Sequence, residues 1–134
     1  MTTTPRTLRL EYSLPDASLR GNYTPASKGG IIARNLLKQK MRFDAGLMAR
    51  EVLLHGQGFE PPFAKARITY RFYHNRKIDL VENLVVGMKS FLDGLVDANV
   101  FPGDDPDHVV PGEHTFTKCA RGESRVEVLI EEIA

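Results

Sequence analysis

The spacing of apolar residues changes along this 134-residue chain, and the order of those changes constrains the fold. From Leu8 to Leu14 apolar and polar residues alternate, which indicates a half-buried strand. Over residues 31–54 apolar residues recur every three or four positions, which is typical of a helix. The alternation returns over residues 66–73, with a cationic second face, and a second helical pattern covers residues 81–98.

Each predicted helix carries one apolar stripe. The first stripe contains Ile32, Leu36, Phe43, Leu47 and Leu54. The second stripe contains Leu84, Met88, Phe91, Leu92 and Leu95. Residues 109–118 and 125–133 add two further strands. The order β-α-β-α-β-β predicts an α/β (α+β) fold, in which two main helices pack on a mixed four-stranded sheet.

Length and composition point to an ordinary globular protein. A chain of this length forms one domain by the usual size of domains, so we expect residues 1–134 to fold as one unit. No apolar run approaches the ~18 residues that cross a bilayer, and the N-terminus lacks the apolar core of a signal peptide. Cys119 is the single cysteine, so it cannot form an internal disulfide. We expect a cytoplasmic protein that does not enter a membrane.

The net charge of +1 conceals a division between the two halves of the chain. Residues 1–78 carry fourteen Lys and Arg against five Asp and Glu, a balance of +9. Residues 79–134 carry four Lys and Arg against twelve Asp and Glu, a balance of −8. Such a division suggests a cationic surface for a polyanion beside an acidic site. The alternative is that the two halves mainly neutralise each other within the fold.

Acidic residues and a lysine gather around the second predicted helix. Asp79 and Glu82 stand at its start, three residues apart, and Lys89 follows seven residues later. On one continuous α-helix these three side chains can share a face. Asp104 and Asp105 come after the helix, in a segment rich in proline and glycine. Carboxylates that can hold a hard divalent cation, set beside cationic groups, suit hydrolysis of a phosphodiester.

This arrangement resembles the RusA family of Holliday-junction resolvases, metal-dependent endonucleases that cut four-way DNA junctions. The family core reads Asp-x-Asp-Asn-Leu, then a helix with Lys-x-x-x-Asp-Gly/Ala-Leu, then a loop with Asp-Asp. The resemblance covers roughly residues 66–133 and is strongest over residues 79–109. The matching pieces here are Asp79, Glu82-Asn83-Leu84, Lys89, Asp93-Gly94-Leu95 and Asp104-Asp105.

The resemblance implies a role for each of these residues. The implied catalytic residues are Asp79, Glu82, Asp105 and Lys89. The implied metal ligands are Asp79, Glu82, Asp104 and Asp105. The cofactor would be Mg²⁺, with Mn²⁺ as an alternative, and the family pattern favours the second acid of the pair, Asp105, as the essential one. Lys89 would stabilise the scissile phosphate or the leaving oxygen.

The chain departs from the family pattern at the first two acids. The family spaces them two residues apart, whereas Asp79 and Glu82 are three apart and the second is a glutamate.

Each candidate site residue also has an ordinary structural interpretation beside the catalytic one. Asp79 or Glu82 can favour a helix N-terminus through the macrodipole. The acidic pair can serve as turn residues, and Lys89 can pair with Asp93 on the helix surface.

The length of the second helix predicts a dimer. At 1.5 Å per residue, residues 82–98 span roughly 24 Å. The next seven residues return at most about 24 Å when fully extended, and proline and glycine oppose full extension. Within one chain, the segment after the helix is therefore barely long enough to place Asp105 beside Glu82. Antiparallel pairing of this helix with its copy would solve the problem, so we expect a RusA-like homodimer whose sites combine Asp79 and Glu82 of one chain with Asp105 of the other.

Basic residues beside the acids are the first candidates for contact with DNA phosphates, which dominate protein–DNA affinity. This first group is Arg71, His74, Asn75, Arg76 and Lys77. A second group, from residues 15–30 and the first helix, is Arg20, Lys28, Arg34 and Lys38. A run of charges is also compatible with a plain solvated surface.

The expected function is therefore a metal-dependent, structure-selective endonuclease that hydrolyses phosphodiesters at four-way junctions in DNA recombination and repair. A second possibility is a catalytically weakened protein of the same fold that binds junction DNA without cutting it. A third is a small metal-binding dimer with no role on DNA, whose basic half meets another anion.

Overall fold

The computed structural model of the chain describes residues 7–21, 24–55 and 62–133, except for the side chains of residues 53–55 and 81–82. The strands are β1 (Thr7–Tyr12), β2 (Ala66–His74), β3 (Val109–Pro111), β4 (Thr115–Lys118) and β5 (Arg125–Glu132). The helices are α1 (Lys28–His55) and α2 (Lys89–Asp97). Three shorter helical turns are η1 (Ala17–Leu19), η2 (Leu80–Val85) and η3 (Val86–Met88).

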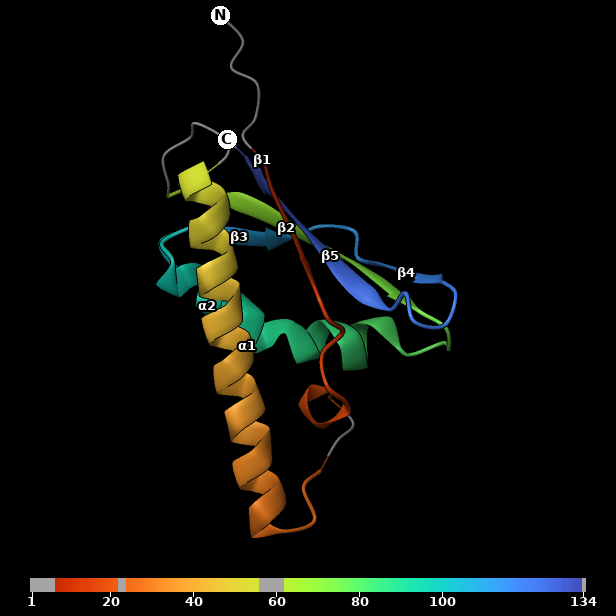
Figure 1. The fold of residues 1–134 in the computed structure, drawn as a ribbon. Coiled ribbons are helices and arrows are strands. Elements are labelled where there is room, and N and C mark those ends of the chain that lie inside the picture. Colours follow the sequence, from red (N-terminus) through yellow and green to blue (C-terminus); the bar gives the residue numbers. More distant parts are fainter. Residues whose placement is uncertain (1–6, 22–23, 56–61, 134) are drawn as a thin grey trace, which may run out of the picture.

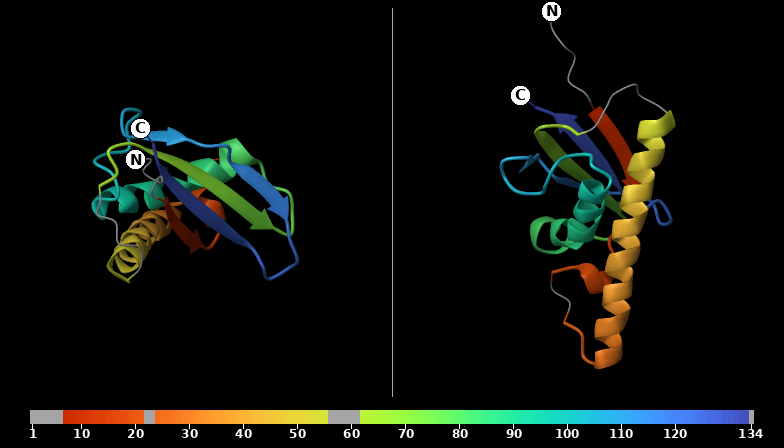
Figure 2. Two further views of the ribbon diagram at one scale, coloured as in Figure 1. Left: turned by 90° about the horizontal axis from the view of Figure 1, so that it is seen from above. Right: turned by 90° about the vertical axis from the view of Figure 1, so that its left-hand side faces the viewer.

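The strands form one mixed sheet in the order β1-β5-β2-β3, with β4 also paired to β2. Strand β5 runs antiparallel to both β1 and β2, whereas β3 and β4 run parallel to β2. Both long helices lie on the same face of this sheet, and α1 extends beyond the rest of the molecule at its N-terminal end (Figures 1 and 2). The predicted mixed α/β architecture is confirmed.

The alternation in the strands separates a core face from an open face. The core-facing residues of β1, β2 and β5 are Leu8, Leu10, Ile68, Tyr70, Phe72, Val126, Val128 and Ile130. The residues between them include Arg9, Arg67 and Arg71, which are exposed on the face that no helix covers. The apolar alternation predicted from the sequence is therefore the core pattern of the sheet.

The sheet has five strands rather than the predicted four, because the strand expected over residues 109–118 is interrupted. The N–H of Gly112 donates to the carbonyl of Ile68 at 2.8 Å, and then the chain leaves the edge of β2. His114 restores the contact with its side chain, since the N–H of Tyr70 donates to Nδ1 of His114 at 3.0 Å. An imidazole thus replaces a backbone carbonyl between β3 and β4, and periodicity alone could not predict this.

The second predicted helix, residues 81–98, is not one continuous α-helix. It starts as the π-helical turn η2, in which the N–H of Leu84 donates to the carbonyl of Asp79 five residues back at 3.2 Å. It tightens to a 3₁₀ turn at η3, where Gly87 lies so close to Pro15 that an added Cβ would be 2.8 Å from the proline Cβ. Regular α-helix begins only at Lys89. The single-helix geometry that placed Asp79, Glu82 and Lys89 on one face is therefore wrong.

The first helix has two contrasting sides. The most deeply buried residues on the core side are Met41, Ala45 and Ala49, which are all at most 3% exposed. Leu37, Met48 and Val52 also pack against the core. The predicted apolar stripe lies on the other side: four of its members, Ile32, Leu36, Phe43 and Leu47, are exposed, and the side chain of Leu54 is outside the described residues. The sequence pattern located the helix correctly but not the side that enters the core.

Candidate functional site

The site begins where α2 ends and the chain reverses. Asn99 adopts a left-handed backbone conformation with φ 60°. The N–H of Asn99 donates to the carbonyl of Val96 at 2.9 Å, and that of Val100 donates to the carbonyl of Leu95 at 3.1 Å. These two bonds form a Schellman motif, which closes the helix and turns the chain back. Val100 is fully buried and fixes the direction of the return.

The reversal brings Asp104 back to Lys89, the first residue of α2. The Lys89 Nζ donates a hydrogen bond to Asp104 and another, of 3.0 Å, to Asp93 one turn along the helix. We call these three residues the Lys89 cluster. Hydrogen bonds to Asp104 and then Asp93 raise the pKa of Lys89, and the bond from Lys89 lowers the pKa of Asp104. Lys89 and Asp104 are therefore both charged at neutral pH.

Asp105, the second acid of the pair, organises its own turn. Its carboxylate accepts the N–H of Asp107 at 2.9 Å and lies 2.8 Å from Nδ1 of His108. Its carbonyl accepts the N–H groups of His108 and Val109, both at 3.0 Å. The hydrogen bond from His108 is the main cause that lowers the pKa of Asp105. The ordinary turn interpretation thus applies to Asp105, which still presents an ionised, half-exposed carboxylate.

The two acids at the helix start are less fully defined. Asp79 is exposed and precedes η2, and its side chain forms no capping hydrogen bond there. Glu82 has its backbone inside η2, but its side chain lies outside the described residues. The structure therefore neither joins nor separates the carboxylates of Glu82 and Asp105, and the shared site between two chains stays a prediction.

The donor groups fit a hard divalent cation in kind. Asp104 and Asp105 present ionised carboxylate oxygens at the surface, and carboxylates are the protein groups that Mg²⁺ prefers. Within the side chains that the structure describes, however, no three His, Cys, Asp or Glu residues gather closely enough to hold a metal ion. A complete metal site from these acids would need Glu82, a second chain or the nucleic acid itself.

A groove of about 440 Å³ lies beside the Lys89 cluster. Its walls are largely apolar and come from the helical side through Val86 and Leu92 and from the sheet through Ile68 and Tyr70. His114 also lines it and stacks on Tyr70, with ring centroids 5.0 Å apart. Burial lowers the pKa of His114. No sequence pattern indicated this groove, because its lining residues come from separate segments of the chain.

The basic loop after β2 was the first candidate for DNA contact. A hydrogen bond of 2.7 Å joins His74 Nδ1 to Ser124 Oγ, so this histidine ties two turns together at the end of the sheet. Asn75 is partly buried, whereas Arg76 and Lys77 are exposed. The two cations remain available to a polyanion, and they lie directly before Asp79 in the chain.

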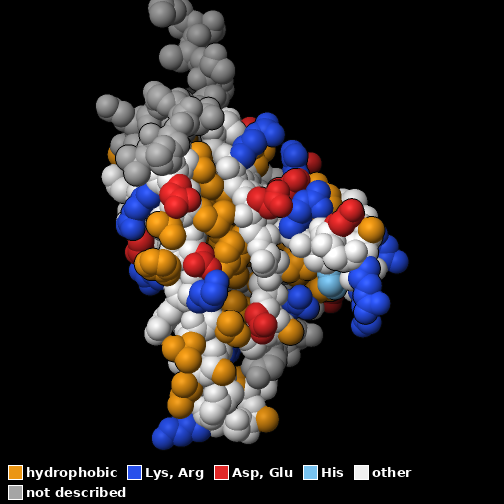
Figure 3. Space-filling model, viewed as in Figure 1, with side chains coloured by type: hydrophobic (Ala, Val, Ile, Leu, Met, Phe, Trp, Pro, Cys, Tyr) orange, Lys and Arg blue, Asp and Glu red, His pale blue; other side chains and the backbone are white. Residues whose placement is uncertain are grey.

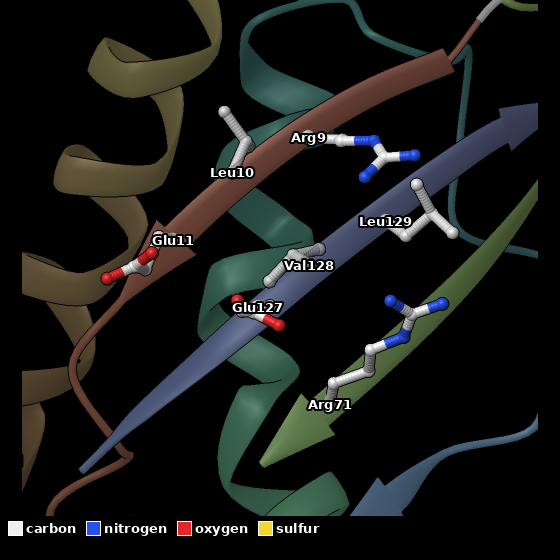
Figure 4. Close-up of a pocket in the computed structure, with 7 residues that line it drawn as sticks. All are labelled: Arg9, Leu10, Glu11, Arg71, Glu127, Val128 and Leu129. Atoms are coloured by element: carbon white, nitrogen blue, oxygen red, sulfur yellow. The ribbon is translucent and has the colours of Figure 1, made fainter. Parts of the chain in front are cut away.

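Arg71 lies instead on the open face of the sheet. Figure 4 shows its guanidinium and that of Arg9 on either side of Leu129, above a shallow groove of about 300 Å³ that Glu11 and Glu127 also line. Within the described part of the chain, neither guanidinium forms an ion pair. Arg9 was missed from the sequence, although its place opposite Leu129 on the polar side of β1 follows from the alternation.

Of the remaining basic candidates, Arg20 follows η1, and its Nε donates to the carbonyl of Pro15 at 3.2 Å. Lys28, Arg34 and Lys38 lie in the N-terminal half of α1. Figures 1 and 2 show this half pointing away from the loop between β2 and η2. The predicted DNA contacts are therefore spread over three surfaces: this half-helix, the open face of the sheet and the loop before Asp79. One chain does not bring them together into a single basic patch.

The two oppositely charged halves of the sequence are partly interleaved in the fold. Arg42 from the basic half forms a two-point ion pair with Asp97 from the acidic half, at 2.6 and 2.8 Å. On the open face, Arg71 is paired in register with Glu127. Figure 3 shows basic and acidic side chains intermingled on the visible face of the molecule. Mutual neutralisation of the halves thus accounts for part of the charge division.

Compared with protein-family models and with curated proteins, the chain matches none of them. None of the helices in the described residues has both the length and the apolar character needed to span a membrane.

Proposed function

We propose that this protein is a metal-dependent endonuclease that acts on four-way DNA junctions, as its resemblance to the RusA resolvases implies. One observation carries the proposal: the loop with Asp104 and Asp105 folds back onto the start of α2. This return places the lysine and the acidic pair of the motif, fifteen residues apart in the chain, on one surface.

The roles proposed for the residues are those that the resemblance implies. Asp79, Glu82 and Asp105 would hold Mg²⁺, with Asp104 as a further ligand, and the bound ion would polarise the phosphodiester. Lys89 is charged and exposed, so it can contact a phosphate oxygen once Asp104 releases it. Arg76 and Lys77 supply cations next to Asp79 for the adjoining DNA backbone. Because the described carboxylates of one chain do not converge, the proposal includes a second chain that completes the site.

The second candidate is a protein that binds junctions without cutting them. It is favoured by the Lys89 cluster, where the lysine ammonium already donates hydrogen bonds to two carboxylates. Asp105 is likewise engaged by His108. If these contacts persist on DNA, Lys89 is not free to act on the scissile phosphate, and binding through the basic surfaces remains.

A cleavage assay with labelled DNA distinguishes the candidates. The protein is incubated with a four-way junction or a linear duplex, with Mg²⁺, with Mn²⁺ or with a chelator. We expect paired, metal-dependent nicks in the junction only. Junction-selective retention without nicks would support the second candidate, and neither nicking nor retention would refute both.

Substitution at the acidic pair tests the assignment of the site. Asp105→Asn keeps an oxygen that can accept the N–H of Asp107, so the turn should persist, but it removes the charge. We expect it to abolish cleavage and to leave binding intact or stronger. Asp107→Asn, two residues further in the same loop, makes the same change in net charge and should cut normally. Equal cleavage by both variants would contradict the role of Asp105.

A further inference from the structure

The N-terminal two thirds of α1 carries large apolar side chains that nothing in the described part of the chain covers. Ile32 is 53% exposed, Leu36 60%, Phe43 67% and Leu47 44%. We call these four residues the α1 seam. Figure 3 shows hydrophobic side chains at the surface over the region where α1 lies. Single exposed apolar residues are common, but a row of four on one helix marks an interaction surface.

The seam is narrow. At 3.6 residues per turn, its four positions fall within a sector of about 60° around the helix. Ile31, which is also exposed, lies outside this sector. A stripe this narrow is typical of helix-to-helix contact, whereas a helix lying on lipid presents a much wider apolar face. The opposite side of α1 is already used in the core, so the seam is available to a partner.

The spacing of the seam identifies the partner as another copy of α1. Its positions are separated by four, seven and four residues, so the pattern reads the same in both directions. In an antiparallel pair about a twofold axis between Gln39 and Lys40, Ile32 of each helix would face Leu47 of the other, and Leu36 would face Phe43. A twofold interface requires such a self-complementary patch, and seams of this heptad type bury their apolar residues in one another.

We propose that two copies of this chain associate through antiparallel pairing of their α1 helices along the seam. The polar groups near the axis are compatible with it. Gln39 is exposed. In the proposed pair it would lie beside the Gln39 of the second chain and could form hydrogen bonds across the axis. The Lys40 ammonium is held 2.5 Å from Asp44 of the same chain, which offsets its repulsion from the second Lys40. The protruding N-terminal part of α1 leaves room for a second helix (Figures 1 and 2).

The inference goes beyond the proposed function, because it places the contact between two chains on α1 rather than on the second predicted helix. It rests on that function only for its biological purpose. Its test needs no DNA. A dimer that does not cut junctions would refute the nuclease and leave this interface standing. A monomer that cuts junctions would refute this interface and support the nuclease.

The first measurement is the mass of the full chain in solution over a dilution series, by light scattering or sedimentation equilibrium. We expect twice the chain mass of 15.0 kDa. Phe43→Glu and Leu36→Glu should each weaken association roughly tenfold or more, because each places a charge in the apolar contact. Ile31→Glu is the matched control on the same helix and should remain dimeric. Circular dichroism verifies that each variant is folded.

A monomeric wild-type protein would overturn the proposal, as would a dimer that survives both seam substitutions or is lost equally in Ile31→Glu. A monomer that sediments with vesicles of phosphatidylcholine and phosphatidylglycerol would assign the seam to a lipid surface instead.

Disulfide crosslinking tests the antiparallel arrangement, even if the glutamate variants prove too unstable to measure. In a Cys119→Ser background, Gln39→Cys lies beside the axis and should crosslink to its own copy under mild oxidation. The two copies of Leu47→Cys would be about 22 Å apart along the helices and should not crosslink. Crosslinking at both positions would show parallel pairing, and crosslinking at neither would show that α1 does not form the interface.

Discussion

Replacing Gly94 by alanine should destabilise the protein, although alanine favours helices. Gly94 lies in α2 where this helix crosses α1. A Cβ added there would be 2.1 Å from the carbonyl oxygen of Arg42 and 2.8 Å from the Cβ of Ala45. Both are held by the backbone of α1, so neither can rotate away. The two helices would have to move apart.

The expected magnitude follows from two opposing effects. In an open helix position, exchange of glycine for alanine stabilises by up to about 1 kcal/mol. Overpacking at a fixed contact costs about 1–3 kcal/mol, and a clash with backbone belongs at the upper end of that range. We therefore expect a net loss of about 1–2 kcal/mol. For a domain of this size this loss lowers the melting temperature by roughly 4–8 °C.

Urea unfolding followed by circular dichroism measures this effect. Gly29→Ala is the control, because the nearest atom to its added Cβ, Ser27 Oγ, is 3.9 Å away and α1 continues through it. That variant should match the wild type or be slightly more stable. Gly46→Ala, whose added Cβ would be 3.2 Å from the carbonyl of Gly94, should fall between the two. Wild-type stability for Gly94→Ala would refute the close crossing of the helices.

Two further predictions concern partly buried hydrogen bonds. His114 accepts the N–H of Tyr70 as a neutral ring, and its pKa in the folded protein lies below 6.5. As the pH falls, the unfolded chain therefore binds a proton at His114 before the folded chain does. The free energy of unfolding should decline as the pH falls below about 6.5. His114→Asn keeps an acceptor and does not titrate, so its stability relative to the wild type should rise between pH 8 and pH 5; parallel urea midpoints would contradict this. Tyr12→Phe removes the 2.5 Å bond from the phenol to Asp44 and should cost about 0.5–1.5 kcal/mol in the same assay, whereas no loss would show that the bond contributes nothing.

Much of the fold could be predicted because the strands follow local rules. Alternation over residues 66–73 and 125–133 marks the two central strands almost to the residue. The break at Gly112 could not be predicted, since it depends on His114 meeting the backbone of Tyr70 from 44 positions away. The irregular start of the second helix likewise depends on the packing of Gly87 against Pro15. Such long-range contacts have no periodic signature.

The candidate site was predictable in part. Proline and glycine beside the acidic pair indicated a loop, and the pairing of Lys89 with Asp93 was anticipated as the ordinary alternative. The contact between Lys89 and Asp104 was not, because it depends on the left-handed Asn99 that reverses the chain. The basic candidates were chosen by nearness in sequence. Nearness in sequence does not reveal that Arg71 points to the open face whereas Lys77 lies in the loop.

The two sides of α1 have different surroundings. Close approach of α2 at Gly94 demands small residues on the inner side of α1, and Ala45 and Gly46 meet that demand. Ile32, Leu36, Phe43 and Leu47 lie on the outer side of the helix, where nothing in the described part of the chain buries them. If the seam forms a dimer, unfolding is coupled to dissociation, and the apparent stability rises with protein concentration. The effect of Gly94→Ala must then be compared in the Phe43→Glu background, where a loss that persists belongs to the helix crossing alone.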